Sequence, residues 1–231
     1  MDKGALQFFD RLKRKGYQAK NICEVGVFLP EASNILGFIR INVETTLIEA
    51  DPQYVAQLHA YFSDRENVQI IEAAVFDFKG KIELSKLGAS TFVSQLKSSP
   101  ALVNDSYLIR EEDKFIADSI LFSEIDKGNF DLLSVDIEGA EWYVIKHMIS
   151  RPNIISLETG GKYYINPYLI EIEDWMTENS YSVWYKHESD TVFIKNGVFR
   201  ITNIEKAMLF FRIILSQIIR KKRTVKNLFK K

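Results

Sequence analysis

The sequence predicts an α/β fold, built on a doubly wound, mostly parallel sheet that finishes with a C-terminal antiparallel strand pair. Short apolar runs alternate with helix-like segments over most of the 231 residues, which is typical of helices packed on both faces of one sheet. The run Asp131–Val135 has the apolar character of a central parallel strand. Two aromatic and β-branched runs, Tyr181–Tyr185 and Thr191–Ile194, flank a polar turn and predict the closing pair.

The remaining elements follow from local patterns, taken in chain order. Residues 1–16 predict a short amphipathic helix rather than a signal peptide, because charged residues interrupt any apolar core. The expected strands are short and apolar: Ile22–Gly26, Thr45–Ile48, Val68–Val75, a hairpin starting at Lys81–Leu84, Asp131–Val135 and Asn153–Leu157. The expected helices are Glu31–Ile39, Pro52–Phe62, Ser119–Ile125, one that begins at Glu141, and Tyr168–Glu178. Residues 86–114 have no clear period, and we interpret them as a mobile or substrate-covering segment.

Charge is distributed unevenly along the chain. The net charge is −1, but residues 1–211 hold 22 basic and 31 acidic residues, a net of −9, and from Arg212 onward there are eight basic residues and no acid. An acidic body argues against a nucleic-acid partner, since nucleic-acid enzymes normally carry a basic face. The single cysteine, Cys23, allows no disulfide framework, so a reducing, cytoplasmic setting is expected.

Three carboxylates follow the central strand directly. Asp136 and Glu138 stand at its C-terminal end, Gly139 permits a tight turn, and Glu141 opens a helix. Ligands of open α/β sheets bind at the carboxyl ends of the strands, so these acids are candidates for a functional site. The structural alternative is that Glu141 complements the helix dipole and that the other two are solvated turn residues. The spacing alone leaves both interpretations open.

Acids at the ends of the first two strands indicate the class of ligand. The first strand ends at Glu24-Val25-Gly26, and the second ends at Glu49, where a Rossmann-like sheet hydrogen-bonds ribose hydroxyls. Because the G-x-G-x-x-G fingerprint and the P-loop lysine motif are both missing, the expected ligand is a nucleoside without pyrophosphate, and S-adenosylmethionine fits. The alternative is that Glu49 has a structural role, as an acid near the N-terminus of the helix that starts at Pro52.

Five segments together resemble the FkbM family of S-adenosylmethionine-dependent methyltransferases. They are Glu24–Gly26, LIEADP (47–52), EAAVFDFKGKIEL (72–84), LLSVDIEGAEWYVI (132–145) and IISLET (154–159), in the family's order over roughly residues 20–196. The resemblance implies a class I methyltransferase fold and O-methylation of a sugar or polyketide-type hydroxyl. The chain departs from the family's first motif, D-x-G-A-N-x-G, because Glu24 replaces the aspartate and Val27, Phe28 and Pro30 replace the Ala, Asn and second Gly.

The resemblance also implies roles for individual residues. Glu24 and Gly26 are expected to line the methionine end of the cofactor, and Asp136 to lie nearest the sulfonium and the acceptor. Glu49 is expected to accept the ribose hydroxyls. Three alanines complete the expected cofactor site, Ala50 beside the ribose and Ala73 and Ala74 beside the adenine.

Methyl transfer requires that an acceptor oxygen be aligned and relieved of its proton. Asp136 and Glu138 are the leading general-base candidates. Asp136 and Glu158, at the ends of neighbouring strands, could also chelate Mg²⁺, but two carboxylates are only a partial site, so we assign no metal ligands. A lone histidine on the following helix, His147, is expected to be structural. The aromatic segment 160–167 lies where an acceptor would enter, and Ser90-Thr91 either covers the cofactor or belongs to a plain loop.

The C-terminal residues form a separate pattern. We predict a methyltransferase domain over residues 1–200 and an amphipathic helix with a basic tail over 201–231. Apolar residues recur at helical spacing from Ile204 to Ile218, and Arg220-Lys221-Lys222-Arg223 follows them. An apolar helix with a polybasic end suits peripheral contact with the inner face of a membrane. The alternative is a helix that packs on its own domain or pairs with a second copy of the chain.

The sequence thus predicts an S-adenosylmethionine-dependent O-methyltransferase that acts on a hydroxyl of a sugar, glycan or glycolipid. Two alternatives remain: a binding module that uses the fold without turnover, which the altered first motif favours, and a methyltransferase of non-carbohydrate small molecules. A nucleoside-dependent enzyme of another kind, such as a reductase, is disfavoured by the lack of the glycine fingerprint.

Overall fold

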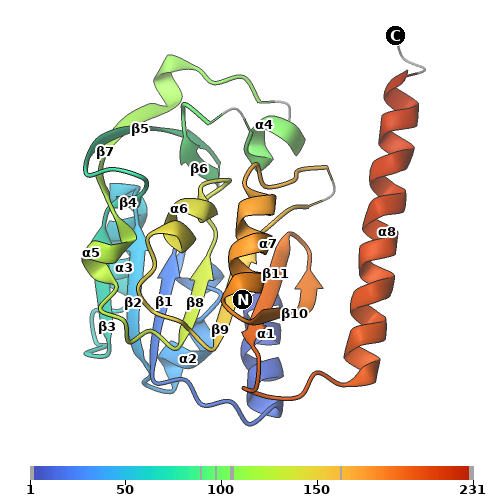
Figure 1. Cartoon of the computed structure of the whole chain (residues 1–231). Coiled ribbons are helices and arrows are strands. Elements are labelled where there is room, and N and C mark those ends of the chain that lie inside the picture. Colours follow the sequence, from blue (N-terminus) through green and yellow to red (C-terminus); the bar gives the residue numbers. More distant parts are fainter. Residues whose placement is uncertain (1–2, 89, 97, 105–106, 162, 229–231) are drawn as a thin grey trace.

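The computed structural model describes residues 3–88, 90–96, 98–104, 107–161 and 163–228 (Figure 1). Its centre is a seven-stranded sheet in the order β10-β11-β9-β8-β1-β2-β3. The strands of this sheet are β1 (Asn21–Val25), β2 (Glu44–Glu49), β3 (Val68–Glu72), β8 (Leu132–Val135), β9 (Ile154–Glu158), β10 (Tyr181–His187) and β11 (Asp190–Lys195). The pairs from β3 to β9 are parallel, and β11 runs antiparallel to both β9 and β10. The predicted doubly wound sheet with a closing antiparallel pair is confirmed.

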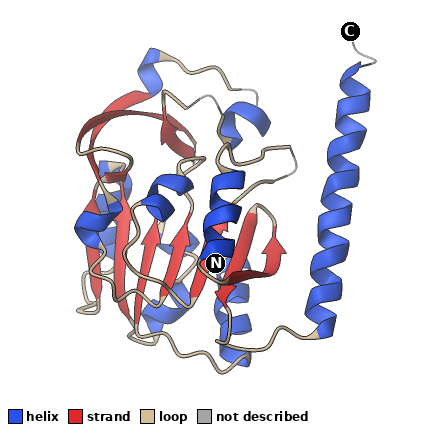
Figure 2. Ribbon diagram, in the orientation of Figure 1, coloured by secondary structure: helices blue, strands red, loops and turns tan. Residues whose placement is uncertain are grey.

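Helices cover both faces of this sheet (Figure 2). They are α1 (Lys3–Arg14), the 3₁₀ helix η1 (Pro30–Ala32), α2 (Leu36–Arg40), α3 (Pro52–Tyr61), α6 (Glu141–Lys146) and α7 (Leu169–Glu178). One core cluster contains Leu12 from α1 and Ile39 from α2, and the other contains Val144 from α6 and Ile172 from α7. The buried apolar side chains are divided between these two clusters, as a sheet that is covered by helices on both faces requires.

The expected helix over Glu31–Ile39 is wrong in its continuity, because the chain leaves helical geometry at Ser33, where ψ is 124°. Ser33 Oγ and the Asn34 backbone N–H both donate to the Glu24 carboxylate, at 2.5 and 2.8 Å. The Glu24 side chain, which comes from β1, thus holds the backbone at Ser33 and Asn34 in a non-helical conformation. The expected helix therefore divides into η1 and α2.

A second, four-stranded sheet in the order β4-β7-β5-β6 lies over the carboxyl end of the main sheet (Figure 1). Its strands are β4 (Ala74–Val75), β5 (Gly80–Leu87), β6 (Ser90–Val93) and β7 (Lys114–Ile120), and it is accompanied by α4 (Pro100–Asn104), η2 (Glu111–Asp113) and α5 (Phe122–Ile125). The predicted hairpin from Lys81 is confirmed.

Three expectations in this region need correction. The strand expected over Val68–Val75 divides at Ala73, because β4 leaves β3 to pair with β7. Ser119, expected in a helix, belongs to strand β7, where its hydroxyl donates to the Phe78 carbonyl at 2.6 Å. The aperiodic residues 86–114 contain strand β6 and short helical turns, which are too brief to produce a sequence period.

Helix α8 (Asn203–Leu228) stands beside β10 and runs along the side of the body (Figure 1). Its first turn is fastened by Glu205, which accepts from Trp184 Nε1 at 2.8 Å and pairs with Lys15 Nζ at 2.7 Å. Seven of its large apolar side chains are exposed, namely Ile204, Met208, Phe210, Phe211, Leu215, Ile218 and Ile219. Leu209, Ile213 and Ile214 are half-buried, so the helix leaves an exposed apolar face without being free of its own domain. None of the helices in the described part of the chain is long and apolar enough to cross a bilayer.

The basic cluster Arg220–Arg223 lies where the structure describes the backbone of α8 but not the side chains. The division into units of residues 1–200 and 201–231 remains a prediction.

Candidate functional site

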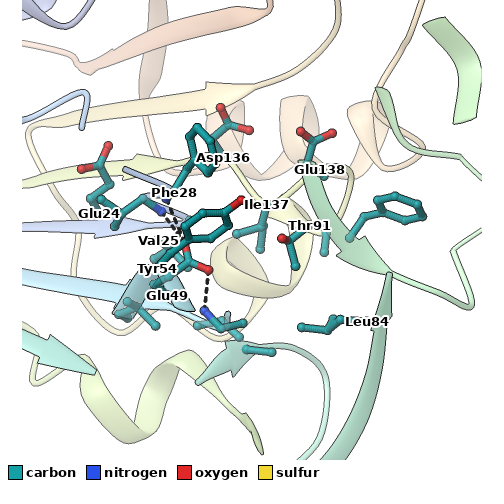
Figure 3. Close-up of a pocket in the computed structure, with 18 of the residues that line it drawn as sticks. Glu24, Val25, Phe28, Glu49, Tyr54, Leu84, Thr91, Asp136, Ile137 and Glu138 are labelled. Carbon is teal, nitrogen blue, oxygen red and sulfur yellow. Dashed lines mark hydrogen bonds between the residues drawn. The ribbon is translucent and has the colours of Figure 1, made fainter. Parts of the chain in front are cut away.

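A cavity of about 280 Å³ opens at the carboxyl ends of the parallel strands, under the second sheet (Figure 3). It receives residues from the ends of β1, β2 and β8, from the β3–β4 junction, from β6 and from the β10–β11 turn. The eight predicted cofactor and catalytic residues all line it, namely Glu24, Gly26, Glu49, Ala50, Ala73, Ala74, Asp136 and Glu138. The structure therefore brings together residues from four separate parts of the sequence, and their individual roles remain predictions.

Glu24 lies near the end of strand β1, and Gly26 directly follows that strand. Glu24 is 2% exposed, and burial raises the pKa of its carboxyl to about 8, against hydrogen bonds from Ser33 and Asn34 that favour the ionised form. Gly26 has a φ of +80°, and a Cβ there would lie 1.9 Å from the main-chain oxygen of Asp136. The glycine is thus required by the contact between the ends of β1 and β8, in addition to any requirement of a ligand.

Glu49, at the end of β2, is 5% exposed and accepts four backbone hydrogen bonds. One carboxylate oxygen accepts from Val27 and Phe28, at 3.0 and 2.9 Å, and the other accepts from Ala50 and Asp51, at 2.8 and 2.9 Å. The side chain therefore ties the turn after β1 to the turn after β2. A carboxylate offers about four acceptor positions, so a ribose hydroxyl at Glu49 would replace one of these N–H donors.

An aromatic pair borders the cavity next to Glu49 (Figure 3). The Phe28 and Tyr54 rings meet edge to face with centroids 4.6 Å apart, and Phe28 has a left-handed φ of 59°. Lys86 from β5 lies 4.0 Å over the Tyr54 ring and pairs with Asp51 at 2.6 Å. These contacts fasten the second sheet to the cavity wall, where an aromatic face suits a flat ligand ring.

Residues of small volume and one hydroxyl face the cavity from the junction of the two sheets. Ala73 and Ala74 are 5% and 8% exposed, which leaves space beside the end of β3. Thr91 belongs to strand β6, so the interpretation of a plain loop at this position is wrong. Its buried Oγ1 has no hydrogen-bond partner among the described residues and is directed into the cavity (Figure 3).

The D-x-E-G-A-E block forms the turn that the sequence predicts. Burial raises the pKa of Asp136 to about 6, which brings it closer to neutral pH than an ordinary aspartate. Glu138 occupies a left-handed conformation with φ 56°, and both residues line the cavity. A carboxylate with a pKa near neutrality at a strand end is suited to accept a proton.

Glu141 is fully buried and holds this turn through hydrogen bonds. One of its oxygens accepts from the Ile137 and Gly139 backbone N–H groups at 3.0 and 3.1 Å, and the other accepts from the Asn166 side-chain amide. The simple interpretation of Glu141 as a helix-dipole acid is therefore incomplete. Burial, together with the charge of Asp136, raises its pKa above the ordinary glutamate value.

Sequence reasoning missed two groups at the site. Glu188, Ser189 and Asp190 line the cavity from the β10–β11 turn, and the register pairs Asp190 with Glu158 at the end of β9. Asn166, 2% exposed, joins Glu141 to the Glu158 carbonyl, which only the folded chain reveals. The acids in the hairpin turn were the available signal for the first group. His147, expected to be structural, bonds Asp77 at 2.7 Å and does not line the cavity.

Comparison with known proteins finds distantly similar solved structures. No curated protein sequence matches the chain. Among solved structures, a Staphylococcus aureus protein described as a caffeoyl-CoA O-methyltransferase has a TM-score of 0.48 and 13% identity, with 85% of each chain covered. An S-adenosylhomocysteine-bound methyltransferase of Podospora anserina has a TM-score of 0.44 and 15% identity over 84% of this chain and 77% of its own. A glycopeptide N-methyltransferase bound to sinefungin has a TM-score of 0.44 and 8% identity, with coverages of 85% and 88%.

The sequence family is decided by a direct match. The methyltransferase FkbM domain matches residues 24–183, well over half of the chain, and this range includes all eight predicted site residues. Together with the strand order of the main sheet and the cavity at its carboxyl edge, this match shows that the chain belongs to the FkbM methyltransferase family.

Proposed function

We propose that this methyltransferase transfers the methyl group of S-adenosylmethionine to a hydroxyl of a sugar, glycan or glycolipid-type acceptor. The observation that carries the proposal is the cavity at the carboxyl ends of β1, β2 and β8, in which Asp136 and Glu138 face the same space as the candidate cofactor residues. In α/β sheets of this order, ligands bind at this edge.

The residues around the cavity fit a nucleoside with an amino-acid tail. Ala73 and Ala74 leave room for a flat ring, and the unsatisfied Thr91 hydroxyl offers a hydrogen bond to it. Gly26 keeps the end of β1 free of a side chain. Glu49 suits a diol once one of its backbone donors is released.

S-adenosylmethionine supplies an electrophilic methyl carbon on a sulfonium. The task of the chain is to align the acceptor oxygen, exclude water and remove the hydroxyl proton. Asp136 is the leading proton acceptor because it lines the cavity and burial raises its pKa to about 6. Glu138, on the same turn, is the second candidate.

The acceptor class is supported by the polar rim of the cavity and by α8. Glu188, Ser189 and Asp190 offer acceptors for sugar hydroxyls, and the nearby segment 160–167 carries Tyr163, 38% exposed, as a stacking surface. The exposed apolar face of α8 and the basic residues that follow it suit an anionic membrane, and a lipid-linked glycan would be presented there.

The proposal is tested by incubating the protein with labelled S-adenosylmethionine and cell-extract glycans, glycolipids and small molecules. We expect labelled methyl groups to appear in the carbohydrate fractions. Label found only in non-carbohydrate small molecules would show that the acceptor is a non-carbohydrate small molecule. Asp136→Asn keeps the shape and removes the basicity, so we expect a folded protein whose rate falls on the order of a hundredfold. A normal rate in this variant would leave proton removal to Glu138 or to alignment alone.

A further inference from the structure

We propose that Asp136, Glu141 and Glu158 form a binding site for a hard divalent cation, of the Mg²⁺, Mn²⁺ or Ca²⁺ class, at the edge of the cavity. The use of such a cation in catalysis rests on the proposed function, whereas its binding does not. The site lies where strand β8 ends, where α6 begins and where β9 ends, so three separate elements contribute one carboxylate each.

The geometry of the three carboxylates suits a cation. One oxygen from each residue lies within 4.8 Å of the other two. Carboxylate oxygens bind Mg²⁺ at about 2.1 Å and Ca²⁺ at about 2.3–2.6 Å, so ligands on one ion lie roughly 3–5 Å apart. The observed spacing therefore places the three oxygens around one ion after little or no movement of the side chains.

Among the residues that the structure describes, the cluster has no basic side chain paired with it. Glu141 is 0% exposed and Glu158 is 6% exposed. The charges that act on Glu158 belong to further acids, Asp136 and Glu141 above all. Buried like charges at this distance need either bound protons or a bound cation.

Two buried oxygens at the cluster point to a missing ligand. Glu158 Oε2 and the Tyr164 hydroxyl have no hydrogen-bond partner among the described residues, and Tyr164 is 0% exposed. The Tyr164 hydroxyl packs against the turn, because a Cβ on Gly139 would lie 2.9 Å from it. Buried polar atoms are almost always satisfied in native proteins, so an ion with its bound water would account for both.

The hydrogen bonds around the cluster hold the ligands in place. The Ile137 and Gly139 backbone N–H groups and the Asn166 amide fix the Glu141 carboxylate, and Asn166 also binds the Glu158 carbonyl. Such outer hydrogen bonds orient metal ligands in known sites. Because Asp136 lines the cavity, a cation on it would lie within reach of an acceptor hydroxyl and would make that hydroxyl more acidic. With the cation bound, Asp136 acts as a ligand and proton removal falls to Glu138, the second candidate on the same turn.

The test measures cation binding directly, on the chelator-treated full chain without cofactor or acceptor. Mn²⁺ is titrated and the free ion is followed by electron paramagnetic resonance, with Mg²⁺ titrated by calorimetry. We expect one saturable site per chain. Glu158→Gln should weaken Mn²⁺ binding at least tenfold, and the exposed control Glu173→Gln should bind like the wild type.

No saturable binding at millimolar Mn²⁺, or equal affinity in Glu158→Gln and the wild type, would overturn the inference and indicate a cluster neutralised by protons. Thermal unfolding checks that Glu158→Gln is folded, and Asp136→Asn serves as the second ligand variant if it is not. S-adenosylmethionine affinity is measured separately in EDTA. Binding of S-adenosylmethionine without binding of Mn²⁺ would contradict only the cation site. Binding of Mn²⁺ without binding of S-adenosylmethionine would contradict the proposed cofactor.

Discussion

Gly26 and Asp136 are in backbone contact at the point where strands β1 and β8 end: a Cβ on Gly26 would lie 1.9 Å from the Asp136 carbonyl oxygen. The Asp136 backbone N–H in turn donates to the Val25 carbonyl at 2.9 Å. Gly26, proposed to lie against the cofactor, and Asp136, proposed as general base, are therefore positioned by the same contact. We expect a change at either residue to affect both cofactor binding and methyl transfer.

A side chain at residue 26 should disrupt the site. Gly26→Ala adds a methyl group against backbone at a φ of +80°, so β1 and β8 must separate. We expect a destabilisation of about 2 kcal/mol or more, and loss of S-adenosylmethionine binding in any protein that folds. Calorimetry and thermal unfolding measure the two effects, and Gly197→Ala, in a turn with open space around it, is the matched control. Equal affinity in Gly26→Ala and the wild type would show that the turn adapts.

Glu49 should contribute to cofactor affinity, and a double-mutant cycle separates its two candidate roles. Glu49→Ala removes a carboxylate that holds Val27 and Phe28, so we expect affinity for S-adenosylmethionine to fall about tenfold or more. The affinities of S-adenosylmethionine and of its 2′-deoxy analogue are each measured with the wild type and with Glu49→Ala. If the carboxylate binds the ribose, the substitution should weaken binding of the analogue much less than binding of S-adenosylmethionine. Equal losses of affinity for both ligands would show that Glu49 acts only by holding the turn at Val27 and Phe28.

Glu24 should make the stability of the fold dependent on pH. Burial raises its pKa to about 8 in the folded chain, above its ordinary value of 4.5, so the folded state retains a proton that the unfolded state releases. Wild-type stability should therefore fall, relative to Glu24→Gln, as the pH rises from about 5 to about 8. The difference should change by up to about 1.4 kcal/mol per pH unit.

Urea unfolding of both proteins at pH 5, 6, 7 and 8 checks the Glu24 prediction. The comparison cancels the other titrating groups, and only the slope of the difference against pH is interpreted. A constant difference over this range would show that Glu24 is ionised in the folded chain, stabilised by Ser33 and Asn34.

Helix α8 should bind anionic vesicles. Deletion of residues 220–231 removes seven basic residues, each contributing roughly 1 kcal/mol near an anionic surface at low salt. We expect the full chain to pellet with anionic vesicles at low salt, and the truncated chain to pellet much less while its cofactor affinity is unchanged.

A variant with Met208→Ser and Phe211→Ser tests the exposed apolar face separately, because both side chains are more than half exposed. Its pelleting should fall at high salt as well as at low salt. Negligible pelleting of the full chain, combined with a dimer in analytical ultracentrifugation that this variant loses, would assign α8 to contact between two copies.

The sequence by itself determined the fold class and which predicted site residues stand at strand ends. Period and turn signals are local properties, and residues at the carboxyl ends of parallel strands converge wherever those strands pair. For this reason Glu24, Glu49 and Asp136 could be placed at neighbouring strand ends from the sequence, and the family resemblance implied that they share one site. The structure places all three on one cavity.

Only the tertiary structure decided what each carboxylate contacts. Glu49 is occupied by backbone donors from a turn 21 residues away, and Asn166 reaches Glu141 across 25 residues of chain. The division of the helix at Ser33 depends on a hydrogen bond to Glu24 in another element. Such contacts depend on three-dimensional packing, and a buried carboxylate binds whichever donors the fold brings to it, so no local pattern contains them.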